Sequence, residues 1–249
     1  MMMSEASTCV VVGASGGLGS SVAARLVGRG CQVVGVDRDE AVVSSTDYRH
    51  YVLDFALSDA PKHLLANLGN TSVTHVLNFS GGALPIEVES DQPLELPLRW
   101  FDETMRDNVI TSINAIRLMS AHTHAPSLDR SITLCSSLNA MGNYGYPFYS
   151  MSKAALESLV CNYCHRLGRS GIRLNALRLG TVLTGTSRQL HGREDSAHYS
   201  RLRRMSALGR FVTAEDVADA AASVALDLHG VTGQILTVDG GQGISGSSS

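Results

Sequence analysis

A tyrosine and a lysine four positions apart, Tyr149 and Lys153, are the residues best suited to do chemistry in this sequence. Pro147 suits the first turn of a helix, so the two side chains are predicted to lie one turn apart on the same helix face. A lysine ammonium beside a phenol favours the phenolate and lowers the phenol pKa, as a general acid/base near neutral pH requires. A surface lysine lying along the helix is the alternative. The spacing predicts a proton-transfer site.

A glycine-rich turn near the amino terminus is suited to bind phosphate. It follows a β-branched run, precedes a helical pattern and reads Gly13-Ala14-Ser15-Gly16-Gly17-Leu18-Gly19. Glycines permit a tight turn and close backbone approach to a pyrophosphate, and the start of a helix offers free N–H groups. A strand, this turn and a helix in that order predict a dinucleotide-binding site.

An acidic residue, Asp37, follows Gly19 by eighteen positions, at the end of the second predicted strand. A carboxylate there accepts hydrogen bonds from the adenosine ribose hydroxyls and repels a 2′-phosphate, which favours NAD over NADP. The adjacent Arg38 would pair with such a phosphate, so NADP is the less favoured alternative. Asp54, just past the third predicted strand, is a further candidate contact for the adenine edge.

A parallel sheet would bring these candidate residues together at one edge. The sequence favours such a sheet, because short β-branched runs alternate with helical patterns. Predicted strands cover Thr8–Val12, Gln32–Val36, His50–Leu53, Thr74–Phe79, Ser131–Cys135, Arg173–Leu179 and Gln234–Val238. Predicted helices cover Leu18–Gly28, Ala60–Leu68, Leu98–Ala121, Pro147–Leu167, Ser187–Met205 and Thr213–His229. The alternation predicts an α/β fold, a doubly wound parallel seven-stranded sheet of the Rossmann type. No linker rich in Pro, Gly or Ser divides residues 1–249, so a single domain is expected.

Two segments interrupt the alternation, at about residues 82–98 and 184–207. Both follow predicted strand ends, where open α/β sheets bind their ligands, so both are candidate substrate loops. Plain surface connections are the alternative.

The composition is that of an ordinary globular protein, with 44% hydrophobic residues, 17% charged residues and a net charge of −3. The absence of a basic excess argues against a nucleic-acid partner. The amino-terminal residues lack the pattern of a signal peptide or a membrane span, so a cytoplasmic protein is expected. Five cysteines form no even framework, as expected of reduced thiols. His122 and His124 lack further ligands at metal spacing, so no metal site is expected.

In their order along the chain, five motifs resemble those of the short-chain dehydrogenase/reductase family, and they span nearly the whole sequence. They are the glycine turn at 13–19, Asn78-Phe79-Ser80-Gly81, Asn108, a serine ahead of Tyr149-x-x-x-Lys153, and Val238-Asp239-Gly240-Gly241. Any one motif is weak, whereas the ordered combination is specific. The family's Asn-Asn-Ala-Gly and Pro-Gly appear here as Asn78-Phe79-Ser80-Gly81 and Leu179-Gly180, and neither change removes a catalytic group.

The resemblance implies a role for each matching residue. Tyr149 would donate or accept the proton, Lys153 would lower its pKa and bind the nicotinamide ribose, and Asn108 would hold a water in the proton relay. Ser136 precedes Tyr149 by thirteen positions, the usual family spacing, and is the predicted oxygen-polarising serine, with Ser137 as the alternative. Implied cofactor contacts are Gly13, Ser15, Gly16, Gly17, Leu18, Gly19, Asp37, Arg38, Asp54, Asn78, Ser80, Gly81, Tyr149, Lys153, Gly180, Val182 and Thr184.

The implied function is reversible hydride transfer between NAD and a small secondary alcohol or ketone. A regulator that binds the nucleotide without turnover is one alternative, against which the intact catalytic positions argue. A dehydratase or epimerase that cycles its NAD internally is another, although such relatives usually carry a larger carboxyl-terminal substrate region. The resemblance also implies a homodimer or homotetramer, with no membrane association.

Overall fold

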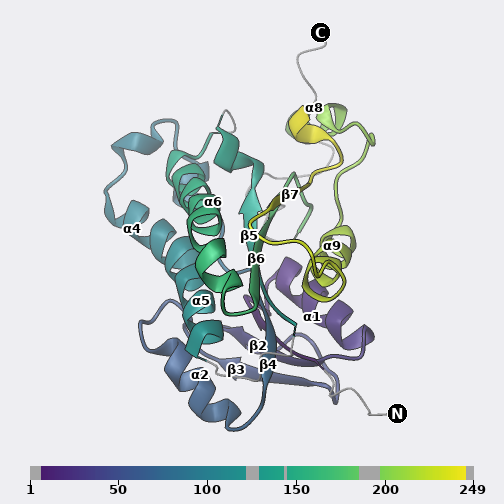
Figure 1. The fold of residues 1–249 in the computed structure, drawn as a ribbon. Helices are drawn as coiled ribbons and strands as arrows, with labels where there is room; N and C mark the ends of the chain where they lie inside the picture. Colours follow the sequence, from purple (N-terminus) through teal and green to yellow (C-terminus); the bar gives the residue numbers. More distant parts are fainter. Residues whose placement is uncertain (1–6, 122–128, 143–144, 185–196, 245–249) are drawn as a thin grey trace.

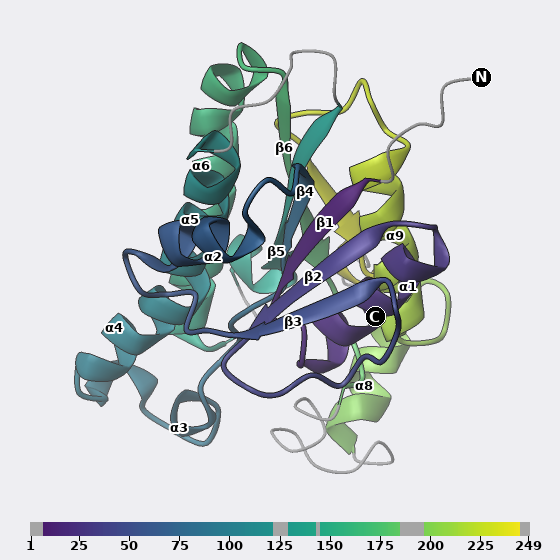
Figure 2. The same cartoon turned by 90° about the horizontal axis from the view of Figure 1, so that it is seen from below.

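The computed structural model describes residues 7–121, 129–142, 145–184 and 197–244, and within them seven parallel strands form one sheet. The strands are β1 (Thr8–Val12), β2 (Gln32–Asp37), β3 (Tyr48–Val52), β4 (Val73–Asn78), β5 (Arg130–Ser137), β6 (Ile172–Leu179) and β7 (Ile235–Val238). Their spatial order is β3-β2-β1-β4-β5-β6-β7, and Figure 2 shows them fanning out with the usual twist. The predicted doubly wound, parallel, seven-stranded sheet is confirmed.

Helices cover both faces of this sheet (Figure 1). One face carries α1 (Gly17–Gly28) and α9 (Ala214–Leu226), which also pack on each other. The other face carries α2 (Ala60–Leu68), α5 (Thr111–Ala121) and α6 (Pro147–Gly168). The described helices also include α3 (Pro85–Val88), α4 (Arg99–Met105) and α8 (Ala197–Met205). None of the helices in the described ranges is long and apolar enough to span a bilayer.

The core has two halves because alternate strand residues point to opposite faces of the sheet. In β1, Val10 and Val12 pack toward α2, α5 and α6, whereas Cys9 and Val11 pack toward α1 and α9. Residues facing both ways are buried, so the central strands are apolar almost throughout, as parallel sheets require.

Two predicted helices differ in the structure. The single helix predicted at 98–121 is divided into α4, a π-helical turn over Arg106–Ile110 and α5. Of the helix predicted at 187–205, α8 is described and residues 185–196 lie outside the described ranges. The short helix α3 was not predicted, since its four residues are too few to show a helical period.

Candidate active site

Tyr149 and Lys153 lie in the first turns of α6, one turn apart as their spacing predicted. Lys153 is 2% exposed, and its Nζ donates to the main-chain oxygen of Cys135 at 2.7 Å. The same ammonium lies 5.4 Å from the centre of the Tyr149 ring. Tyr149 is half-buried, so its phenol lies in a corner between α6 and the end of β5.

Burial is the largest influence on the pKa values of Tyr149 and Lys153 in this corner. Burial raises the pKa of Tyr149 well above its usual value, the Cys135 thiol adds to the rise, and a hydrogen bond with Ser137 partly opposes it. Burial also lowers the pKa of Lys153. Loss of water on burial therefore shifts both groups toward their neutral forms in the chain by itself.

The structure corrects the choice between the two adjacent serines. The two serines end β5, and each has different partners. The Ser136 hydroxyl donates to Oε1 of Glu157 at 2.7 Å, farther along α6 than Tyr149, where Glu157 also pairs with Arg178. Ser137 is near enough to Tyr149 to oppose the rise in the phenol pKa, and its hydroxyl donates to Oδ1 of Asn139 at 3.1 Å. The contacts of the two hydroxyls therefore favour Ser137, the alternative, over Ser136.

Asn108 lies in the π-helical turn, where the i to i−4 hydrogen-bond ladder is interrupted. Its Nδ2 donates to the main-chain oxygen of Thr104 at 2.9 Å and to that of Gly82 at 3.1 Å. The Asn108 side chain thus supplies a hydrogen bond to the main-chain oxygen of Thr104, just before the π-helical turn. Its Oδ1 is buried and meets no donor among the described residues, so this atom keeps an unused acceptor beside the site.

The segment after β4 holds this turn in place. Gly81 has a φ of 90°, and a Cβ added there would lie 2.5 Å from Oδ1 of Asn108, so only glycine fits. Asn78 is buried, donates to Oγ of Ser112 at 3.0 Å and accepts from Oγ of Ser80 at 2.6 Å. Asn78, predicted as a cofactor contact, has its side chain occupied by these contacts within the protein, whereas Ser80 and Gly81 line a pocket.

The glycine turn between β1 and α1 has the shape expected of a phosphate site. Gly13 has a φ of 80°, and a Cβ there would lie 2.6 Å from the main-chain nitrogen of Ser80. A Cβ on Gly19 would overlap the main-chain oxygen of Gly13. The residue that precedes α1, Gly16, makes no side-chain cap, so the first turn keeps backbone N–H groups for a ligand.

Three predicted cofactor contacts, Gly180, Val182 and Thr184, lie in the segment that follows β6. Gly180 packs so closely on Asp239 that a Cβ would lie 2.7 Å from the Asp239 Cβ. Val182 forms a single parallel bridge with Val212. Thr184 then lies over the glycine turn, 3.2 Å from where a Cβ on Gly17 would be. Leu18, by contrast, packs against the core between α1 and α9.

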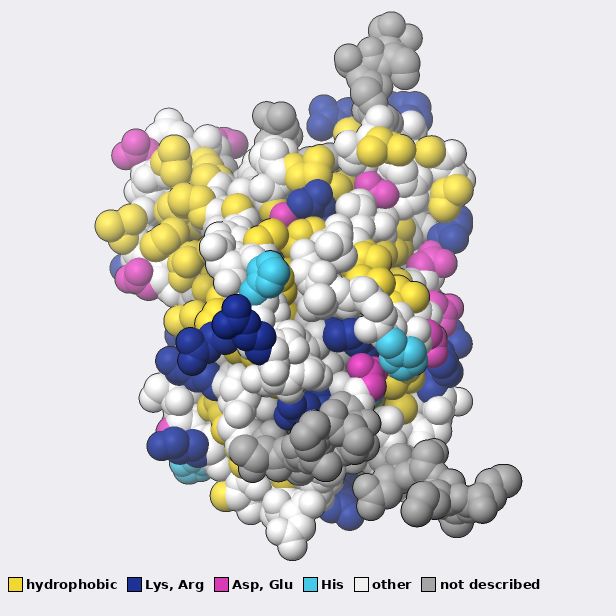
Figure 3. All heavy atoms as spheres, viewed as in Figure 1, with side chains coloured by type: hydrophobic (Ala, Val, Ile, Leu, Met, Phe, Trp, Pro, Cys, Tyr) yellow, Lys and Arg dark blue, Asp and Glu magenta, His cyan; other side chains and the backbone are white. Residues whose placement is uncertain are grey.

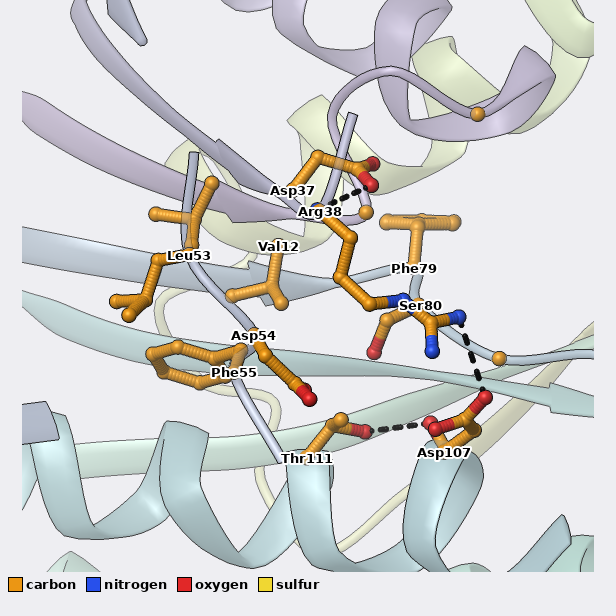
Figure 4. A pocket seen from close by; sticks show the side chains of 14 residues that line it. Val12, Asp37, Arg38, Leu53, Asp54, Phe55, Phe79, Ser80, Asp107 and Thr111 are labelled. Carbon is orange, nitrogen blue, oxygen red and sulfur yellow. Dashed lines mark hydrogen bonds and ion pairs between the residues drawn. The ribbon is translucent and has the colours of Figure 1, made fainter. Parts of the chain in front are cut away.

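A pocket lies beside the glycine turn (Figure 4). Its described lining is Val12, Gly13, Gly16, Val36, Asp37, Arg38, Leu53, Asp54, Phe55, Phe79, Ser80, Gly81, Asp107 and Thr111. Asp37 accepts from the main-chain nitrogen of Ser15 at 2.9 Å and from that of Arg38 at 2.7 Å, so its carboxylate joins the turn to the end of β2. Asp54, the predicted adenine contact, also lines the pocket, where it pairs with Arg106 and accepts from the main-chain nitrogen of Ala56.

Together these features fit a nicotinamide dinucleotide. Apolar walls suit a flat base, the Asp37 carboxylate suits ribose hydroxyls, and the uncapped start of α1 suits a pyrophosphate. The buried, unpartnered Oδ1 of Asn108 lies beside the catalytic corner and is free to accept a further hydrogen bond. The arrangement would therefore bring a redox-active ring to the proton-transfer pair.

Sequence reasoning missed Glu87, which caps the catalytic helix from another segment. This carboxylate is 1% exposed and accepts from the main-chain nitrogens of Phe148 at 2.6 Å and Tyr149 at 3.2 Å. Burial raises its pKa, while the two backbone hydrogen bonds partly oppose the rise. One sequence signal could have pointed to such a cap: Tyr146, which precedes Pro147, has a side chain that cannot cap a helix.

Glu87 also anchors the predicted substrate loop at 82–98. Around this anchor the loop exposes large apolar side chains, with Leu94 at 69% and Leu98 at 71%. Figure 3 shows apolar side chains gathered at the upper left, where Figure 1 places α4 and the segment before it. In the second predicted loop, the described Tyr199 of α8 is fully buried and packs edge-on against Phe211.

In the described ranges, no three or more His, Cys, Asp or Glu side chains lie close enough together to bind a metal ion. His122 and His124 lie outside those ranges.

Comparisons with known proteins extend over nearly the whole chain. A family model described as enoyl-(acyl carrier protein) reductase matches residues 13–242. A 2-dehydro-3-deoxy-D-gluconate 5-dehydrogenase of Bacillus subtilis is 25% identical over 245 residues, which are 94% of this chain and 93% of that protein. The 3-oxoacyl-(acyl-carrier-protein) reductase FabG of Escherichia coli is 29% identical, with 95% and 97% covered. The crystal structure of a short-chain dehydrogenase/reductase family oxidoreductase from Burkholderia thailandensis superposes with a TM-score of 0.86 at 26% identity, over 98% and 94% of the two chains.

Proposed function

The chain belongs to the short-chain dehydrogenase/reductase family of NAD(P)-dependent oxidoreductases, and from this premise we propose that it interconverts a secondary alcohol and a ketone. Tyr149 is the general acid/base of this reaction. The observation that carries the proposal is the half-buried Tyr149 phenol, with Ser137 close to it and the Lys153 ammonium beside its ring. The names of the similar relatives, a 5-dehydrogenase and a 3-oxoacyl reductase, support the reaction type.

The residues of the chain divide the work of ketone reduction. A bound nicotinamide supplies the hydride. Ser137 donates a hydrogen bond to the carbonyl oxygen of the substrate, and Tyr149 gives that oxygen its proton. In alcohol oxidation Tyr149 takes the proton back, and the positive charge of Lys153 stabilises the phenolate that precedes this step.

NAD is the proposed cofactor, and Asp37 supports this choice. Its carboxylate lies at the end of β2, next to the glycine turn, where it meets ribose hydroxyls favourably and a phosphate unfavourably. The short connection between β2 and β3 brings Arg38 to the same pocket, so NADP binding is the alternative that the experiment must measure.

The proposal extends to the compartment, the partners and the oligomeric state of the protein. Five free cysteines support a reducing, cytoplasmic compartment, and the net charge of −3 gives no support for a nucleic-acid partner. By resemblance to the family, the chain is proposed to assemble as a homodimer or homotetramer and to act on a small molecule.

The proposal is tested with purified protein, NAD or NADP, and a panel of secondary alcohols and ketones, by following the absorbance of the reduced nicotinamide. Tyr149→Phe should lower turnover of any accepted substrate about 10³-fold, since general acid/base catalysis contributes on this scale. Nucleotide binding should persist in this variant. Equal turnover by Tyr149→Phe would remove Tyr149 from its role.

The same experiment separates the alternatives. A wild-type chain that binds NAD and turns over nothing in a broad panel would favour a nucleotide-binding regulator. A dehydratase or epimerase would convert its substrate with no net change in reduced nicotinamide, which product analysis by mass spectrometry or NMR reveals.

A further inference from the structure

The pocket beside the glycine turn has an unusual balance of charge. Asp37, Asp54 and Asp107 line it, and Arg38 is the one cation among its described lining residues. A phosphate on the adenosine ribose would need that cation, because three carboxylates repel it. Whether Arg38 is available therefore decides what the pocket accepts.

Arg38 is held by an acid from a distant segment. Its Nη2 donates to Oδ2 of Asp107 at 3.2 Å, and Figure 4 shows the side chain extending across the pocket to reach it. The other oxygen of Asp107 accepts from Arg106 at 2.8 Å, and Arg106 also pairs with Asp54. Both oxygens of Asp107 thus have cationic partners, and the four side chains form one chain of ion pairs.

Asp107 is the fixed member of its pair with Arg38. It lies in the π-helical turn that carries Asn108, its side chain is 14% exposed, and its main-chain oxygen accepts from Thr111 at 2.9 Å. Arg38 follows the end of β2 in a loop, with 59% of its side chain exposed. The guanidinium therefore adapts to Asp107, and its position depends on that carboxylate.

We propose that Asp107 is a specificity-determining residue, which holds Arg38 in an ion pair and so keeps it from binding a 2′-phosphate. This inference rests on the proposed function, because it concerns the nucleotide of that site. Asp37 repels the phosphate directly, whereas Asp107 removes the cation that would compensate. A guanidinium released from Asp107 has the planar donors that pair well with phosphate.

The test measures the dissociation constants of NADH and NADPH for the whole chain by calorimetry. Asp107→Asn keeps the shape of the side chain and removes its charge, so the ratio of the NADPH constant to the NADH constant should fall about tenfold. Asp102→Asn is the matched control, since this exposed acid lies in α4 and outside the pocket, and it should leave the ratio unchanged.

Arg38→Ala gives an independent measurement if Asp107→Asn does not fold. In the wild-type background it should change the ratio less than about twofold, because Arg38 is already engaged. Combined with Asp107→Asn it should abolish the tenfold gain. A large loss of NADPH affinity in Arg38→Ala alone would show that Arg38 is already available and would overturn the inference.

Other outcomes are also decisive. An unchanged ratio in a folded Asp107→Asn variant with a lowered melting temperature would mean that Asp107 only joins the loop to the π turn, and the inference would fall while the proposed function stands. If the wild-type chain binds neither nucleotide, the proposed function itself fails.

Discussion

The two edges of the sheet both hold polar clusters, and the clusters use their hydrogen bonds differently. Near the amino ends of the strands, Arg173 is buried and donates to Asp129 and to the main-chain oxygens of Val224 and Ala225 at the end of α9. These bonds join strand to helix. The cluster therefore contributes to stability by closing the carboxyl end of α9.

At the carboxyl ends of the strands, key polar groups face a pocket or keep unused capacity. The Tyr149 phenol is half-buried, Oδ1 of Asn108 meets no donor among the described residues, and Asp37 lines the pocket. Such groups are available to a ligand. The comparison teaches that free hydrogen-bonding capacity marks a functional site better than the number of polar residues does.

The largest expected effect is a loss of folding stability at acid pH that depends on the amino edge and not on the carboxyl edge. Burial lowers the pKa of His75, near the amino edge, to about 4, against 6.5 when unfolded. As pH falls from 7 toward 4, the unfolded chain binds this proton first, so the chain loses about 3 kcal/mol of stability. Urea unfolding across this range should show the loss in the wild type and not in His75→Asn.

His63→Asn supplies the control, because it removes an exposed imidazole and leaves the buried one of His75 in place. Nucleotide binding at neutral pH should be the same in the His75 variant. A His75 variant with the full acid loss, or without nucleotide binding, would break the distinction between the two edges.

The second prediction tests the carboxyl edge with adjacent serines. Ser137→Ala should lower kcat/KM about 10²-fold, the usual cost of one donor to a reacting oxygen. Ser136→Ala should change it only a few-fold, since Ser136 faces Glu157. Steady-state kinetics on one substrate compares the two, and the reverse order would restore the family spacing as the better guide.

The third prediction concerns Glu87, which lies at the carboxyl edge but uses its carboxylate to accept hydrogen bonds from the backbone of α6. Glu87→Ala should lower the free energy of unfolding by about 2 kcal/mol, because it removes the cap of the catalytic helix. Glu89→Ala, an exposed acid two positions along, should change it by less than about 0.5 kcal/mol. Equal effects in denaturant titrations would show that the buried contact adds nothing.

The smallest expected effect sharpens the assignment of the pocket. Asp37→Ala should improve binding of NADPH relative to NADH about fivefold, since it removes one charge near the ribose. Calorimetry with both nucleotides measures the ratio. Unchanged discrimination would remove Asp37 from the ribose contact.

Features that depend on near neighbours along the chain could be predicted from the sequence alone. Strand and helix periods predicted the sheet, and α2 has the predicted bounds, Ala60–Leu68. Tyr149 and Lys153 were predicted together because four positions on one helix bring two side chains to one face. The glycine turn was predictable for the same reason, since its backbone needs are local.

The partners of each side chain, by contrast, depend on the tertiary structure. The spacing to Tyr149 chose Ser136, whereas in the fold Ser136 donates to Glu157 and Ser137 lies near Tyr149. Burial, which sets the pKa of Tyr149, is a property of the packed chain. Arg38 meets Asp107 across 69 positions, through a π turn that no period reveals. Such contacts depend on how whole elements pack, and no short stretch of sequence contains that information.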